Sequence, residues 1–254
     1  MKGVLFDLDG VFYVEEHVIA GGMDCLRWLK EQQIPYRFVT NNTTLSRKDL
    51  TAKLRQLGLT VQAEEIVSAN YAGVLVLEQR KLRRCRLILR PEAQRDYPTH
   101  CIKSPDAIVI GDIGNRWDYD LLNELMNQVM DGAEIIALHK GRYHQGGNGL
   151  LLDSGAFVAA LEHATGKQAV VVGKPNPTFF ELASNTFGCN PDELLMVGDD
   201  LINDIGGAKQ MGMHTVLVQT GKYRKRIVEA SNIQPDGCIP SIKELPAYLE
   251  NTII

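Results

Sequence analysis

Short apolar runs recur along this chain, and the segments between them have the periodicity of helices. The runs at residues 194–197 and 215–218 contain no charged residue, as strands buried on both faces require. In one intervening segment, Leu50, Leu54 and Leu57 fall on one face of a helix. This alternation is typical of an α/β fold in which helices cover a parallel sheet.

The expected elements form two groups. The two ends of the chain share one set of expected strands, at residues 3–6, 36–39, 66–67, 194–197 and 215–218. After a basic run at 80–84 comes a second set, with strands at 86–89, 107–110 and 135–138 and helices around 121–129 and 155–165. We therefore predict a three-layer, Rossmann-like core of residues 1–80 and 169–254, with a separate α/β domain, residues 81–168, inserted into it.

Composition restricts the class of partner. The formal net charge of -4 argues against a nucleic-acid or membrane surface as the main partner. The five cysteines form no Cys-x-x-Cys pair, so we interpret them as reduced thiols. No signal segment precedes the first expected strand, and no apolar run approaches membrane-spanning length. We expect a cytoplasmic protein, and a homodimer is compatible with the sequence.

Two carboxylates, Asp7 and Asp9, follow the first apolar run and stand directly before Gly10. Residues two apart in a strand point to the same side, so both carboxylates would lie at one edge of the sheet. Like charges so close favour a cation between them, and hard oxygen ligands suit Mg²⁺. The alternative interpretation is a surface Asp-x-Asp-Gly turn.

Three further polar clusters follow expected strands. Hydroxyl and amide groups at 40–43 suit phosphate oxygens, although the same residues would also form a capping turn. Lys174 could hold an anion or simply be solvated. A group of aspartates, Asp199, Asp200 and Asp204, suggests magnesium, with helix capping by Asp200 as the alternative. In an open parallel sheet such groups meet at the carboxyl edge, where ligands bind.

Taken together, these clusters resemble the motifs of the haloacid dehalogenase superfamily of aspartate-dependent phosphohydrolases. Four matches carry the resemblance, in the family's order: residues 7–11, Thr40 with Asn41, Lys174 within Gly-Lys-Pro, and residues 198–200 with Asp204. The inserted domain resembles the large (type C2) cap of subclass IIA, the NagD-like proteins. Residues 140–143, 172–175, 212–214 and 220–223 are most similar to the branch of phospholysine phosphohistidine inorganic pyrophosphate phosphatase.

The resemblance implies a division of roles among these residues. Asp7 would be the nucleophile that forms an aspartyl-phosphate, and Asp9 the general acid and base. Mg²⁺ would be held by Asp7, by the main-chain carbonyl of Asp9 and by Asp199. The phosphate oxygens would be bound by Thr40, Asn41, Asn42 and Lys174. Asp200 and Asp204 would orient Lys174 or metal-bound water.

The inserted domain should select the substrate. Lys140, Arg142, Tyr143 and His144 follow an expected strand and are our candidates for contact with the leaving group; a solvent-facing loop is the alternative. The glycine-rich segment 146–149 does not open a helix after a strand, so we interpret it as a flexible loop and not as a dinucleotide-binding turn.

We therefore expect a Mg²⁺-dependent hydrolase that acts on small phosphorylated metabolites or on substrates of the phosphoamino-acid or pyrophosphate type. Two alternatives stay open at this point. One is a phosphotransferase or mutase of the same superfamily, which would pass the phosphoryl group to a sugar hydroxyl. The other is a module that binds a phosphorylated ligand without turnover, although the presence of both Asp7 and Asp9 speaks against it.

Overall fold

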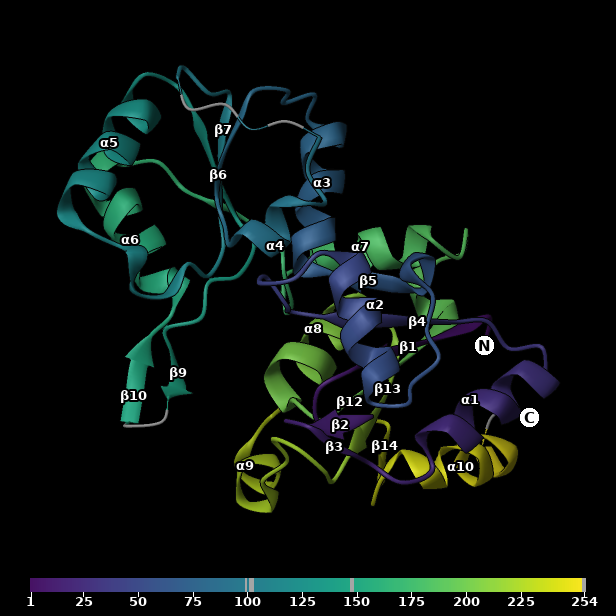
Figure 1. The fold of residues 1–254 in the computed structure, drawn as a ribbon. Coiled ribbons are helices and arrows are strands. Elements are labelled where there is room, and N and C mark those ends of the chain that lie inside the picture. Colours follow the sequence, from purple (N-terminus) through teal and green to yellow (C-terminus); the bar gives the residue numbers. More distant parts are fainter. Residues whose placement is uncertain (99, 101–102, 147–148, 253–254) are drawn as a thin grey trace. The chain divides into compact units, whose positions relative to one another are not determined.

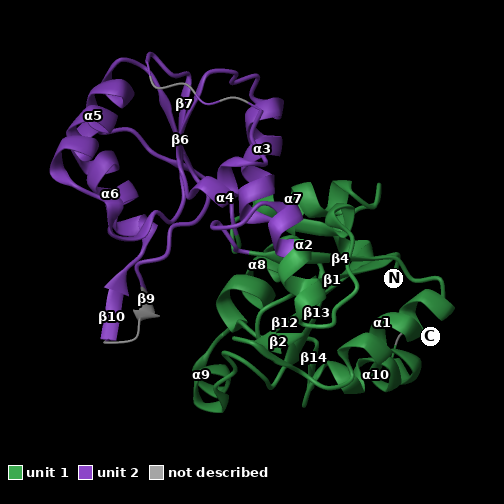
Figure 2. Cartoon of the chain, in the orientation of Figure 1, with its two compact units in different colours: residues 1–40, 51–67, 174–254 green, residues 41–50, 68–173 purple. Residues whose placement is uncertain are grey.

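The computed structural model describes residues 1–98, 100, 103–146 and 149–252. The chain divides into two compact units (Figure 2). Unit 1 comprises residues 1–40, 51–67 and 174–254, and unit 2 comprises residues 41–50 and 68–173. Among the described residues, no helix is both long and apolar enough to span a membrane.

Unit 1 contains a six-stranded sheet in the order β14-β13-β12-β1-β4-β5 (Figure 1). Its strands are β1 (Gly3–Asp7), β4 (Tyr36–Thr40), β5 (Ile66–Ser68, whose last residue begins unit 2), β12 (Leu194–Gly198), β13 (His214–Val218) and β14 (Gly237–Ile239). The central strand β1 pairs in parallel with both β12 and β4. Val4, Leu5 and Phe6 are fully buried, as the continuous apolar run predicts for a strand covered on both faces.

Helices and short turns connect these strands. The α-helices are α1 (Gly22–Glu31), α2 (Arg47–Gln56, which begins in unit 2), α7 (Pro177–Asn185), α8 (Gly207–Gln210), α9 (Lys225–Ala230) and α10 (Leu245–Thr252). A small hairpin, β2 (Tyr13–Val14) with β3 (His17–Val18), follows the first motif. Phe6, Phe12 and Phe38 form an aromatic cluster, with the rings of Phe12 and Phe38 edge to face at 5.3 Å.

Unit 2 has its own four-stranded sheet in the order β11-β8-β7-β6, joined by parallel pairings. The strands are β6 (Cys85–Ile88), β7 (Ala107–Ile110), β8 (Glu134–Ala137) and β11 (Val170–Val171), and the helices are α3 (Ala69–Gln79), α4 (Pro91–Gln94), α5 (Tyr119–Met130) and α6 (Ser154–Thr165). Leu125 of α5 and Val158 of α6 are fully buried against Ile108 of β7 in one hydrophobic cluster. Unit 2 therefore has a core of its own.

An antiparallel hairpin extends from unit 2, formed by β9 (Tyr143–Gly146) and β10 (Gly149–Leu152) (Figure 1). From the sequence we expected only a flexible loop at 146–149, of which residues 147–148 lie outside the described part of the chain. Leu150, Leu151 and Leu152 are all exposed on β10, so no buried face gives this strand the alternating pattern by which strands are recognised.

The structure confirms the predicted fold class, an α/β protein with a parallel core sheet and a second α/β unit. The unit boundaries lie at other residues than the sequence division at 81 and 168. The segment 41–50 is held within unit 2, where Asp49 pairs with Arg95 at 2.7 Å and the Arg47 guanidinium lies 3.3 Å from the centre of the Tyr71 ring. Such long-range contacts leave no mark in local composition.

Candidate active site

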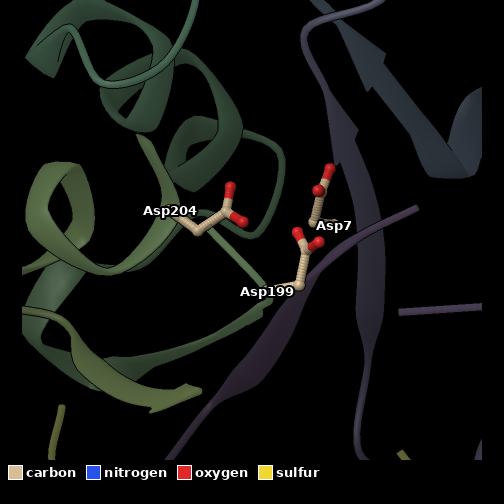
Figure 3. Close-up of side chains that lie close together, drawn as sticks. All are labelled: Asp7, Asp199 and Asp204. Atoms are coloured by element: carbon tan, nitrogen blue, oxygen red, sulfur yellow. The ribbon is translucent and has the colours of Figure 1, made fainter. Parts of the chain in front are cut away.

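Charged side chains of unit 1 meet where β1 and β12 end. Asp7 is the last residue of β1, and Asp199 directly follows β12. Asp204 lies in η4 (Leu201–Gly206), a π-helical turn, which is a feature often found at functional sites. Figure 3 shows the three carboxylate groups gathered in one place, and one oxygen of each lies within 4.8 Å of the others.

Lys174 links two of these carboxylates. Its Nζ donates to Asp7 Oδ1 and to Asp204 Oδ1, both at 2.7 Å, and more weakly to the Val39 carbonyl at 3.5 Å. Only 4% of Lys174 is exposed. Burial alone would lower its pKa, but attraction to Asp204 and Asp7 outweighs burial and raises the pKa above its ordinary value. The ammonium therefore stays charged inside the site.

Asp199 is fixed through one carboxylate oxygen only. Its Oδ2 accepts the backbone N–H of Lys222 at 2.6 Å. Gly10 and Gly221 pack against the same oxygen with positive φ, and a Cβ atom at either position would overlap it. The other oxygen, Asp199 Oδ1, is buried and has no hydrogen-bond partner among the described residues. A buried acceptor without a donor is costly, so this oxygen points to a ligand that the protein itself does not supply.

The electrostatics of the cluster favour a cation. Burial and repulsion from Asp7 raise the pKa of Asp199 to about 8. Burial and Asp7 also raise the pKa of Asp204, against the opposing attraction of Lys174. Three carboxylates around one ammonium leave an excess of negative charge in a buried space. The site therefore fits a metal ion, and Asp199 Oδ1 is the oxygen best placed to bind one.

Asp204 and Asp200 have their oxygens committed to protein donors. Asp204 Oδ1 holds Lys174, and Oδ2 accepts the backbone N–H of Asp200 at 3.1 Å. Asp200 caps η4 by accepting the backbone N–H groups of Ile202 and Asn203, and its Oδ2 also accepts from Lys222 Nζ. Burial alone would raise the pKa of Asp200, but these bonds outweigh it and lower the pKa. Asp200 therefore caps η4, which was the alternative interpretation of this residue in the sequence.

The other residues of the first two motifs lie near strand ends. Asp9 is exposed, two residues beyond the end of β1, while Thr40 is buried as the last residue of β4. Asn42 Oδ1 accepts the backbone N–H groups of Thr44 and Leu45, at 3.1 and 2.9 Å, which is the turn role considered for this cluster. Asn41 belongs to unit 2, where its Nδ2 lies 3.4 Å from His139 Nδ1.

The residues proposed to contact the leaving group lie on or before β9 in unit 2. Lys140 forms an ion pair with Glu162 of α6 at 2.6 Å, which is a structural partner. Arg142 and Tyr143 are exposed, and Tyr143 is 57% exposed. The backbone of His144 lies in β9, but its side chain is outside the described part of the structure.

Sequence reasoning missed the segment that fixes Asp199. Lys222 acts on it through a backbone N–H, and Thr220 donates its hydroxyl to the carbonyl of Gly10. A backbone donor is present in every residue except proline, so side-chain identity gives no signal for it. The available signal was the Thr-Gly-Lys sequence directly after a buried strand, because a glycine there permits close approach to a neighbouring loop.

Comparison with known proteins shows which family this sequence is similar to. Residues 4–99 match the family model described as haloacid dehalogenase-like hydrolase, and residues 171–245 match the HAD-hydrolase-like model. Haloacid dehalogenase-like hydrolase domain-containing protein 2 from Pongo abelii is 40% identical, over 92% of this chain and 90% of that protein.

Two further comparisons extend over nearly the whole chain. Phospholysine phosphohistidine inorganic pyrophosphate phosphatase from Bos taurus is 35% identical over 96% of this chain and 92% of that protein. The crystal structure of 4-nitrophenylphosphatase from Thermotoga maritima is 27% identical, with a TM-score of 0.88 and coverage of 97% of each chain.

Proposed function

This chain is a haloacid dehalogenase-like hydrolase of the NagD-like class and an enzyme of the phosphatase type, and we propose that it hydrolyses small phosphorylated compounds with Mg²⁺ as cofactor. The observation that carries the proposal is the cluster at the ends of β1 and β12. There Lys174 pairs with Asp7, and Asp199 presents a buried oxygen with no partner among the described residues.

In the proposed reaction Asp7 attacks phosphorus. A carboxylate oxygen of Asp7 forms a bond to phosphorus while the bond to the leaving oxygen breaks, which gives an aspartyl-phosphate. Asp9, exposed just beyond β1, donates a proton to the leaving oxygen. Asp9 then takes a proton from a water molecule, whose oxygen attacks phosphorus and releases inorganic phosphate and the free Asp7 carboxylate.

The charge on the phosphoryl group needs donors around it. We assign the non-bridging oxygens to Thr40, Asn41 and Lys174, of which Lys174 supplies the buried positive charge. Asn42 would contribute through the turn that it forms with residues 44 and 45. Asp204 keeps Lys174 in position.

A divalent cation would be held by Asp7, Asp199 and the main-chain carbonyl of Asp9. Bound there, Mg²⁺ would neutralise the carboxylates and the phosphoryl group, which must approach each other. Asp204 is a member of the same carboxylate group, but Lys174 and the Asp200 N–H occupy its oxygens. We therefore assign Asp204 the role of orienting Lys174.

The substrate class is inferred from the relatives. The name of one relative specifies phospholysine, phosphohistidine and inorganic pyrophosphate, and the solved structure from Thermotoga maritima is that of a 4-nitrophenylphosphatase. We propose that this chain acts on small phosphorylated metabolites or on phosphoamino-acid or pyrophosphate-type substrates. Residues of unit 2 around β9, chiefly Arg142, Tyr143 and His144, would select among them.

The test is an assay of the purified protein with p-nitrophenyl phosphate, with Mg²⁺ and after chelation. We expect phosphate release that disappears on chelation and returns when Mg²⁺ is added. Activity that survives thorough chelation would contradict the metal assignment. An added alcohol acceptor separates hydrolysis from transfer: equal yields of nitrophenol and phosphate support a hydrolase, whereas phosphorylated alcohol as the main product would support a phosphotransferase.

A further inference from the structure

A histidine and an aspartate of unit 2 form a hydrogen-bonded pair that the proposed reaction does not use. His139 follows β8 by two residues, and its Nε2 lies 3.1 Å from Asp153 Oδ2. Both side chains are largely buried, with 25% of the His139 side chain and 16% of the Asp153 side chain exposed. Gly141 leaves room for the pair, because a Cβ atom there would overlap both partners.

Asp153 is itself held in one orientation. It is the residue before α6, and its Oδ1 accepts the backbone N–H of Ser154 at 2.6 Å. Ser154 Oγ in turn donates to the His139 carbonyl at 3.3 Å. The start of α6 therefore fixes both the aspartate and the backbone of the histidine. A carboxylate on one imidazole nitrogen determines which hydrogen-bonding role the other nitrogen plays.

The remaining nitrogen faces Asn41. In the neutral imidazole whose Nε2 proton is donated to Asp153, His139 Nδ1 is an acceptor, and Asn41 Nδ2 lies 3.4 Å from it. Donation of one amide hydrogen to His139 selects the rotamer of the Asn41 side chain and distinguishes its nitrogen from its oxygen. Asn41 directly follows Thr40, the last residue of β4.

We propose that Asp153 and His139 position the side-chain amide of Asn41 for phosphate binding; the proposal rests on the proposed function, in which Asn41 binds a phosphoryl oxygen. His139 and Asp153 are thus positioning residues, which act through Asn41 without touching the substrate.

The test compares His139→Ala, Asn41→Ala and the double variant. We expect each single variant to raise KM for p-nitrophenyl phosphate and the inhibition constant of inorganic phosphate by about tenfold, with kcat changed less than about threefold. The double variant should resemble Asn41→Ala, because the two residues act as one unit. Asp153→Asn keeps the volume but reverses the preferred imidazole tautomer, so it should reproduce His139→Ala.

His163→Ala is the matched control, because His163 is an exposed histidine on α6 in the same unit. It should leave all constants unchanged. Thermal stabilisation by inorganic phosphate supplies a readout that needs no turnover, and it should weaken in His139→Ala and Asn41→Ala but not in the control.

The positioning role would be overturned if the fold-changes in KM of the two single variants multiplied in the double variant. It would also be overturned if the variants lowered kcat and left KM unchanged. If the wild-type protein hydrolyses no phosphate ester, the proposed function fails instead. The phosphate-binding measurement then decides the positioning role by itself.

Discussion

Two lysines, Lys174 of unit 1 and Lys140 of unit 2, follow neighbouring parallel strands, β11 and β8, yet they have different surroundings. In unit 1, Lys174 is 4% exposed and shared between two buried carboxylates. In unit 2, Lys140 follows β8, but 35% of its side chain is exposed and its partner is Glu162 of a neighbouring helix. A buried charge requires partners, whereas an exposed one can be solvated. Burial, and not charge alone, therefore distinguishes Lys174, which we assign to the proposed active site, from Lys140.

The largest expected effect on activity concerns the nucleophile. Asp7→Asn keeps the size of the side chain but removes the attacking charge, so turnover should fall by roughly ten-thousandfold or more. Folding should persist, because the change also removes repulsion from Asp199. Kinetics and thermal unfolding of the same sample measure both effects. Appreciable Mg²⁺-dependent turnover in the variant would mean that water attacks phosphorus directly.

The two lysines provide a matched test of burial. Lys174→Met leaves Asp7 and Asp204 without their shared cation, so the free energy of unfolding should fall by about 3–5 kcal/mol. Lys140→Met removes a lysine whose side chain is 35% exposed, and Glu162 keeps the backbone N–H of Ala169 as a donor, so the loss should be less than about 1 kcal/mol. Urea unfolding with chelator present measures both. Equal losses of unfolding free energy in the two variants would mean that burial does not distinguish Lys174 from Lys140.

Stability should also depend on pH through Asp199. Its pKa is about 8 in the folded protein, compared with an ordinary value of 3.8. Between those values the native state holds a proton that the unfolded chain has lost, so stability falls as pH rises and levels off above about pH 8. Carboxylates with lowered values, such as Asp106 at about 2, titrate below this window.

The measurement is urea unfolding of the metal-free protein at several values between about pH 5 and pH 8. Asp199→Asn should reduce the dependence to the part that Asp204 contributes, and Mg²⁺ should reverse it, because the ion competes with the proton for the carboxylate of Asp199. Metal-free stability that rises with pH over this range would contradict the burial argument for the cluster.

The smallest effect is expected from the segment of unit 2 that contains Arg142 and His144. Replacing Arg142 and His144 by Ala should change the ranking among phosphorylated substrates by a few-fold and leave phosphoenzyme hydrolysis nearly unaltered, because that step uses only the proposed core residues. Rates on a panel of substrates check the ranking. An equal loss of rate on every substrate, or no change in any rate, would mean that this segment does not select the substrate.

The sequence predicted that polar residues directly after buried strands would meet, and the structure brings Asp7 and Asp199 together. Asp7 ends β1 and Asp199 directly follows β12, and parallel strands of one sheet bring such positions to one edge. Lys174 also follows an apolar run, but that strand, β11, belongs to the sheet of unit 2 and not to the core sheet in which the sequence division placed it. The partner of the Lys222 backbone N–H was not predicted, because it reaches Asp199 through tertiary packing and the Thr-Gly-Lys sequence does not specify which carboxylate it meets. The contact between Asn41 and His139 spans 98 residues and has no local signature.

The boundary of unit 2 also depends on tertiary contacts that the local sequence does not specify. Helix α3 reads as one more helix of the alternating pattern, so the sequence division placed it in the core, whereas its contacts assign it to unit 2. Tyr97, for example, donates its hydroxyl to the carbonyl of Asn70 in α3 at 2.9 Å. Periodicity identifies a helix but does not specify which sheet it packs against.

In the proposed reaction, Asp7 carries the phosphoryl group during turnover. The direct measurement is to stop the reaction with acid, reduce the protein with borohydride and identify the modified peptide by mass spectrometry. An aspartyl-phosphate at Asp7 would be converted to homoserine at that position, and Asp7→Asn protein would show no such product. Reduction at Asp9, at Asp199 or at no residue during active turnover would contradict the account.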